Sequence, residues 1–187
     1  MRSTFLLLAV ALATSVPVMA TETIPVASFR NVELRGGGEV TLVPGPQQRV
    51  TILEGSSAYT RIRVDHSGKL WIDACNASCP RHYELRIEIQ SPRVPGLGIS
   101  GGGSIHAAGG FAPQDDIAVG INGGGKVDVR AVEGREVAVG VNGGGLALVR
   151  ARSSLSVGVN GGGEVRYLGK PQVTSAIDGG GTVRPIS

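Results

Sequence analysis

Apolar and polar residues alternate strictly through the second half of the chain. The alternation runs over residues 117–121, 137–141, 155–159 and 173–177, with Ser175 at one otherwise apolar position. A period of two places the apolar residues on one face, as in a half-buried β-strand. A second short strand follows each of these, and its apolar residues on the same face are Ile105, Val127, Ala147, Val165 and Val183. The pattern predicts strands and no helix over residues 95–187.

Three glycines separate the two strands of each repeat and return at a regular distance. The triplets begin at residues 101, 123, 143, 161 and 179, so successive repeats span 22, 20, 18 and 18 residues. This regular repeat spacing is typical of stacked β-coils, in which equivalent residues of neighbouring coils lie about 4.8 Å apart and form one continuous core. Parallel strands connect right-handed by default. We therefore predict an all-β fold, a right-handed parallel β-helix (β-solenoid).

Each corner carries a polar residue before its glycines. These polar residues are Ser100, Asn122, Asn142, Asn160 and Asp178. We predict that they stack as a structural ladder in which each side chain bonds to the next coil, while glycine supplies positive φ and lets the next backbone approach closely. A column of small residues alternates with the apolar positions: Gly98, Gly120, Gly140, Gly158 and Ala176.

Residues 21–94 contain short runs of branched residues separated by turn signals. The runs predict strands at residues 40–43, 50–53, 62–64, 70–72 and 85–89. The segment from Leu34 to Gly38 is a distant copy of the repeat. We therefore expect the N-terminal strands to continue the solenoid or to cap it.

The first twenty residues have the parts of a secretory signal peptide. Arg2 supplies the positive charge, residues 5–13 the apolar stretch, and Val18-Met19-Ala20 the cleavage site. The apolar stretch is shorter than the roughly 20 residues that span a bilayer. We predict a signal peptide over residues 1–20 and one mature domain over residues 21–187. The mature domain is expected to have no transmembrane segment and to reach the periplasm, the cell surface or the medium.

The chain has two cysteines, Cys75 and Cys79, which lie close together. In an exported protein such a pair usually forms a disulfide. The alternative is a redox or metal site, but two sulfurs and His82 would supply only three zinc ligands. The spacing therefore favours a structural disulfide in a tight turn.

The basic residues are scattered, and the formal net charge is only +3. Nucleic-acid binders concentrate basic residues on one face, so no nucleic-acid partner is predicted. Matching repeat positions place Arg130 with Arg150 and Arg166 with Arg184. These arginines are candidates for contact with an anionic polysaccharide or lipid headgroups, and the alternative is an ordinary solvated face.

The glycine-rich segments match several catalytic sequence motifs, but the helix that these motifs require is not predicted. Residues 96–101 fit the dinucleotide fingerprint and residues 98–102 fit the hydrolase nucleophile elbow. Both motifs need a helix after the strand. The calcium-binding nonapeptide is also absent, because only Asp128 falls at its aspartate position. The acidic pair Asp115-Asp116 lies in a loop-like stretch. We predict no catalytic residues, no cofactor and no metal.

Taken together, several segments make the chain resemble the GIN-domain family, described as "putative autotransporter adhesin head" domains of exported bacterial proteins. The segments are residues 29–32, 45–50, 67–72, 85–103 and the Asn-Gly-Gly-Gly repeats. The resemblance covers residues 21–187 and implies a right-handed β-helix-like fold and an extracytoplasmic location. It carries over no catalytic residues.

The function that follows is a non-enzymatic, adhesin-like binding or structural module of the bacterial cell envelope. Its expected partners are an envelope polysaccharide or another surface protein, and its solenoid ends could associate with one another. The alternative is a β-helix carbohydrate-active enzyme that acts on anionic polysaccharide.

Overall fold

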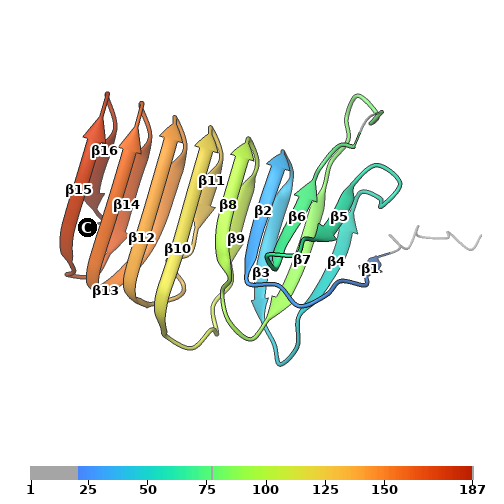
Figure 1. Cartoon of the computed structure of the whole chain (residues 1–187), viewed down its shortest axis with the longest axis horizontal. Helices are drawn as coiled ribbons and strands as arrows, with labels where there is room; N and C mark the ends of the chain where they lie inside the picture. The colour runs from blue at the N-terminus through green and yellow to red at the C-terminus, as the bar shows by residue number, and fades with distance from the viewer. Residues whose placement is uncertain (1–20, 77, 187) are drawn as a thin grey trace, which may run out of the picture.

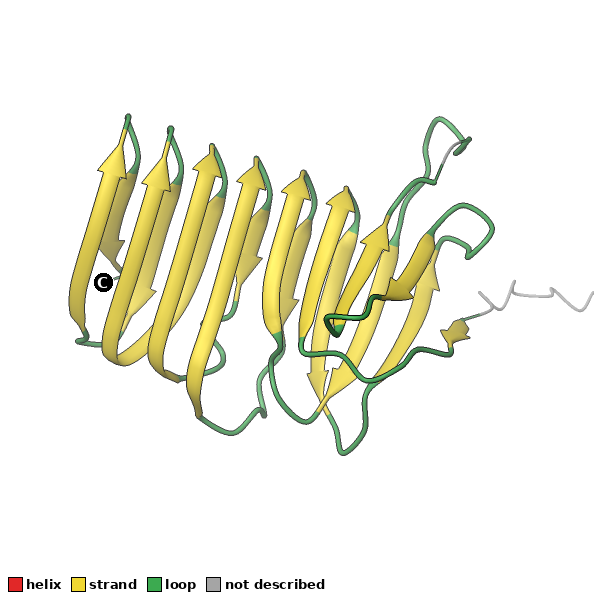
Figure 2. Cartoon of the chain, in the orientation of Figure 1, coloured by secondary structure: helices red, strands yellow, loops and turns green. Residues whose placement is uncertain are grey.

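A computed structural model describes residues 21–76 and 78–186 of the chain, and all regular elements in this part are β-strands (Figures 1 and 2). The strands are β1 (Glu22–Ile24), β2 (Asn31–Gly36), β3 (Glu39–Pro44), β4 (Arg49–Glu54), β5 (Arg61–Val64), β6 (Lys69–Asp73), β7 (Arg86–Ser91), β8 (Gly96–Gly101), β9 (Ser104–Ala107), β10 (Gln114–Gly123), β11 (Lys126–Asp128), β12 (Gly134–Gly143), β13 (Leu146–Asn160), β14 (Glu164–Leu168), β15 (Gln172–Asp178) and β16 (Thr182–Pro185). The all-β class is confirmed.

The signal peptide predicted over residues 1–20 lies outside the described residues. Among the described residues, no helix could cross a membrane.

The strands form two layers that face each other along the length of the molecule (Figure 1). We call the layer β5-β6-β2-β8-β10-β12-β13-β15 sheet B, and the layer β1-β4-β7-β3-β9-β11-β13-β14-β16 sheet A. The long strand β13 belongs to both, because it pairs with β14 through residues 146–150 and with β15 through residues 154–160. The apolar faces of the two sheets meet and form the core.

The repeats stack in the register that the alternation predicts. Val119 pairs with Val139, which pairs with Val157, and all three are about 4% exposed or less. In sheet A, Val127 pairs with Ala147, which pairs with Val165. Similar side chains therefore occupy equivalent positions in successive coils. Valine, isoleucine and alanine fill the narrow core between the two sheets.

The glycine corners require glycine for two separate reasons, as Gly143 shows. Its φ is +118°, a conformation that L-residues disfavour. A Cβ at this position would also lie 2.7 Å from the carbonyl oxygen of Gly123 in the preceding coil. The second reason exists only because the coils are stacked.

The N-terminal part joins the stack out of sequence order. Strand β2 pairs in parallel with β8 on one side and with β6 on the other, and β3 lies likewise between β9 and β7. Gly36 pairs with Gly101, so the distant copy of the repeat at Leu34–Gly38 is one coil of the stack. The coil at residues 31–44 is therefore inserted between coils that follow it in the chain.

Antiparallel strands close the N-terminal end of the molecule. Strand β5 pairs antiparallel with β6, and β4 pairs antiparallel with β7 and β1. The sheets therefore have mixed strand orientation, and they differ here from a continuous parallel winding. The reason is that β4 and β5 connect to their neighbours by reversing direction rather than by completing a turn of the coil.

Candidate binding face

A shallow groove of about 660 Å³ crosses the outer face of sheet B, at right angles to its strands. Its floor is the column of small residues noted in the sequence, one from each of five neighbouring strands: Gly98, Gly120, Gly140, Gly158 and Ala176. A second column of small residues, which includes Gly96, Ala118 and Ala138, widens the floor. The sheet therefore presents exposed backbone along most of its length.

The central glycines of the floor are not required by the fold. A Cβ at Gly140 or Gly158 would meet no atom within 4 Å, and at Gly120 the nearest atom would lie 3.9 Å away. None of these three glycines has a positive φ. Glycine inside a strand costs roughly 0.5–1 kcal/mol relative to alanine. Such a glycine often marks a place where a ligand or another backbone approaches closely.

One wall of the groove is the polar column predicted as a structural ladder. Asn122, Asn142 and Asn160 pair in register on neighbouring strands, between Ser100 and Asp178. Among the described residues, however, no hydrogen bond joins one asparagine side chain of this column to another. The asparagines and Asp178 are exposed. The side-chain amides of this column are therefore exposed on the outer face of sheet B.

The N-terminal end of the groove is built from charged and aromatic side chains. Glu33 pairs with Gly98 on one side and with Trp71 on the other, so all three lie in the line of the floor. A Cβ at Gly98 would lie only 2.0 Å from Glu33 Oε2, so this glycine, unlike Gly140, is needed to seat a side chain. Ser100 Oγ donates to Glu33 Oε1 at 2.6 Å.

Cations surround Trp71, the single tryptophan of the chain. The Arg35 guanidinium lies 3.8 Å from the centre of its ring, and Lys69 Nζ lies 4.8 Å from it. The indole Nε1 donates to Asp65 Oδ2 at 2.7 Å, which holds the ring in place. The sequence pattern does not predict this cluster, because Arg35 lies on β2, Lys69 and Trp71 lie on β6, and Asp65 lies in the turn between β5 and β6.

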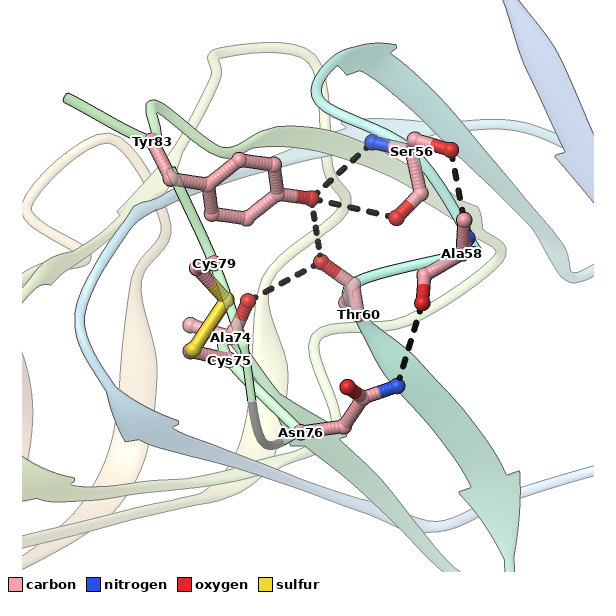
Figure 3. Close-up of a disulfide and its surroundings, with 8 residues drawn as sticks. All are labelled: Ser56, Ala58, Thr60, Ala74, Cys75, Asn76, Cys79 and Tyr83. Atoms are coloured by element: carbon pink, nitrogen blue, oxygen red, sulfur yellow. Dashed lines mark hydrogen bonds between the residues drawn. A yellow bond between two sulfur atoms is a disulfide. The ribbon is translucent and has the colours of Figure 1, made fainter. Parts of the chain in front are cut away.

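The disulfide replaces a glycine corner in the coil formed by β6 and β7. Cys75 and Cys79 are linked, with their Cα atoms 5.9 Å apart, as the spacing predicted (Figure 3). Tyr83 closes the turn: its hydroxyl lies 2.6 Å from Thr60 Oγ1 and accepts from the Ser56 amide at 2.9 Å. These contacts make the cysteine turn a structural element of the N-terminal end.

The first pair of candidate arginines is engaged with carboxylates of the protein. Arg130 Nη2 lies 2.7 Å from Asp128 Oδ2, and Arg150 Nη2 lies 3.5 Å from Glu133 Oε2. Burial raises the pKa of Asp128, but the hydrogen bonds from Arg130 outweigh it and the net direction is downward. This carboxylate is therefore ionised and partly neutralises the arginine beside it.

The second pair, Arg166 and Arg184, lies side by side in sheet A and shares one carboxylate. Arg166 Nε donates to Glu164 Oε1 at 2.8 Å, and Arg184 pairs with the same oxygen. The hydrogen bond from Arg166 is the main cause of the lowered pKa of Glu164. An anionic ligand at these arginines would have to compete with Glu164.

The acidic candidates do not assemble into a site. Asp115 pairs with Arg135 at 3.3 Å, and Asp116 lies opposite Glu136 in the neighbouring strand. Within residues 21–76 and 78–186, no group of three histidine, cysteine, aspartate or glutamate side chains is placed to hold a metal ion.

Comparisons with known proteins agree with this architecture. The family model described as "Putative auto-transporter adhesin, head GIN domain" matches residues 112–171. No curated protein matches the chain. A solved structure titled a putative adhesin, from Bacteroides fragilis, is similar with a TM-score of 0.55 and 18% identity, over 89% of this chain and 96% of that chain. This likeness shows a shared fold.

Two further solved structures are similar at lower scores. A putative cell adhesion protein from Clostridium sporogenes has a TM-score of 0.44 and 13% identity, over 89% of this chain and 98% of that chain. A putative adhesin from Parabacteroides merdae has a TM-score of 0.41 and 16% identity, over 90% of this chain and 96% of that chain.

Proposed function

Since the resemblance to the GIN-domain family is confirmed over residues 112–171, we propose that this protein is a non-enzymatic, adhesin-like binding module. The predicted signal peptide supports export to the bacterial cell envelope or the medium. The parallel, in-register stack of residues 96–185 supports a right-handed β-helix, because parallel crossover connections are almost always right-handed.

The groove of sheet B is the binding site in this proposal. The observation that carries it is the open floor at Gly120, Gly140 and Gly158, where glycine lowers strand stability and no neighbouring atom requires it. A side chain there would keep a ligand away from the backbone of the sheet. The glycines are therefore explained by a ligand that lies flat along the groove.

An extended polysaccharide is the ligand that fits this geometry best. The strands repeat about every 4.8 Å, a distance comparable with the length of one pyranose unit. Each strand offers an amide at Asn122, Asn142 or Asn160 that can both donate to and accept from sugar hydroxyls. Lys69 and Arg35 lie beside the N-terminal end of the groove and favour a chain that carries carboxylates. Such a chain would have to compete with Glu33 for Lys69, at 3.9 Å, and with Asp73 for Arg35, at 3.6 Å.

The test is retention of the purified protein on immobilised polygalacturonate, with neutral dextran as a second matrix. Replacing Gly140 and Gly158 by valine fills the floor with residues that favour strands, so we expect binding to fall while the fold is kept. The control is Arg130→Gln with Arg150→Gln, which leaves the groove unchanged. Unchanged retention of the valine variant on every matrix tried would refute the groove as the binding site.

The enzymatic alternative has little support in the same groove. Glu33 on β2 and Asp178 on β15 are the two carboxylates that line it, and they are separated by five strand spacings, or about 24 Å. Paired carboxylates that cleave a glycosidic bond lie about 5–9.5 Å apart. Polysaccharide cleavage that is abolished by Asp115→Asn or Asp116→Asn would contradict the non-enzymatic proposal.

A further inference from the structure

The C-terminal end of the stack lacks one coil of neighbours. Among residues 21–76 and 78–186, strand β15 pairs only with β13, and β16 pairs only with β14. Val173 and Ile177 are 37% and 44% exposed, whereas their partners Leu155 and Val159 are at most 3% exposed. One additional strand beside β15 would cover these two side chains as the preceding strands cover their own neighbours.

The two edge strands of this end differ in how they are protected. Strand β16 contains Arg184 and Pro185, and both residue types discourage pairing at a sheet edge. The amides of Thr182 and Ile186 donate to the carbonyl oxygens of Gly163 and Tyr167 in the preceding coil, at 2.9 and 2.8 Å. By alternation, position 185 faces the open edge, where proline has no N–H to offer. Sheet A is therefore blocked at this point.

Strand β15 has none of this protection. Its seven residues include no proline, lysine or arginine. The carbonyl of Asp178 accepts from Gly161 N at 2.7 Å, so the backbone of residue 178 faces β13. Alternation then turns the backbone N–H and C=O groups of Val173, Ser175 and Ile177 toward the open edge. These groups form a ready template for an added strand.

We propose that β15 pairs with β15 of a second copy of this chain, antiparallel, about a two-fold axis at Ser175. In that register Ser175 lies opposite itself and Val173 lies opposite Ile177, so the apolar residues of both copies stay on the core face. On the outer face Gln172 lies opposite Asp178, an amide opposite a carboxylate. The sequence of β15 is thus complementary to itself in side chains and in backbone groups.

In the part of the chain that the structure describes, the strands at the N-terminal end offer no comparable partner for β15. The edge of sheet B there is β5, which has four residues and carries Arg61 and Arg63. The edge of sheet A is β1, which has three residues. A symmetric contact closes after two copies, whereas a head-to-tail contact would continue into a filament. The proposal therefore specifies a dimer.

Sedimentation velocity over a concentration series tests the dimer. We expect the wild-type protein to pass from monomer to dimer and no further as its concentration rises. Ser175→Pro removes an edge N–H without touching a bond to β13, and Ile177→Lys places a charge in the seam. Each should weaken dimerisation about tenfold or more. Leu53→Lys is the matched control: Leu53 is exposed to a similar degree, 38%, but lies on β4 at the far end, and its change should leave the dimer unaltered.

A single cysteine then tests the axis itself. Residues directly opposite in a hydrogen-bonded antiparallel pair have Cα atoms about 5.5 Å apart, within the range of a disulfide. Ser175→Cys should therefore link two copies on mild oxidation, and Ala176→Cys, whose symmetry mate is displaced by two residues, should link far less. A wild-type protein that stays monomeric up to its solubility limit, open-ended oligomers, or equal linking of the two cysteine variants would each overturn the proposal.

Discussion

Replacing one corner glycine by alanine tests whether the coils are stacked as tightly as the structure shows. At Gly143 the backbone has φ +118°, and a Cβ would lie 2.7 Å from the carbonyl oxygen of Gly123. The next corner is equally close, since a Cβ at Gly161 would lie 2.8 Å from the carbonyl oxygen of Gly143. The coil cannot move away from one neighbour without pressing on the other.

The expected loss of stability combines these two effects. Left-handed backbone costs an L-residue roughly 1–2 kcal/mol. Overpacking against a fixed backbone adds roughly 1–3 kcal/mol. Gly143→Ala should therefore lower the free energy of unfolding by about 2–5 kcal/mol, and the melting temperature by about 4–20 °C for a domain of this size.

The matched control is the next residue in the same corner. Gly144 has no positive φ, and a Cβ there would meet nothing within 4 Å. Gly144→Ala should change stability by no more than about 0.5 kcal/mol. Urea denaturation of both variants, followed by circular dichroism, gives the two values. Equal stabilities for the two variants would refute the close contact between coils.

Three further variants probe the N-terminal end, each by urea or thermal unfolding. Tyr83→Phe removes the hydroxyl that Thr60 and Ser56 contact and should cost about 1–3 kcal/mol, whereas no loss would show that water replaces these bonds. Cys75→Ser with Cys79→Ser opens a short loop and should cost about 2 kcal/mol, and reducing agent should then have no added effect. Hydrogen bonds from Ser67 and then Trp71 lower the pKa of Asp65, so its contribution is present above the unfolded pKa of about 4 and declines as the pH falls below it. The stability difference between wild type and Asp65→Ala, read from Trp71 fluorescence, should therefore shrink below about pH 4; a difference that persists unchanged to lower pH would contradict this assignment.

The sequence alone determined the repeat region. Successive copies lie 18 to 22 residues apart and pack on each other, so each sequence repeat forms one coil of the stack. The register of Val119 on Val139, the glycine corners and the cysteine turn all follow from spacing that is local in the chain. Residues that contact their own copies leave a visible pattern.

The arrangement of the N-terminal part and of the groove depends on contacts between segments that lie far apart in the chain. Gly36 and Gly101 pair although 65 positions separate them (101 minus 36), and no repeat of that length exists in the chain. The placement of Arg35 over Trp71 depends on that same insertion of β2 beside β6. The glycine column could be read as a packing device until the structure showed open space above Gly140. A segment that occurs only once in the chain leaves no periodic pattern that would identify its partner. The packing of the whole domain determines which segments it contacts.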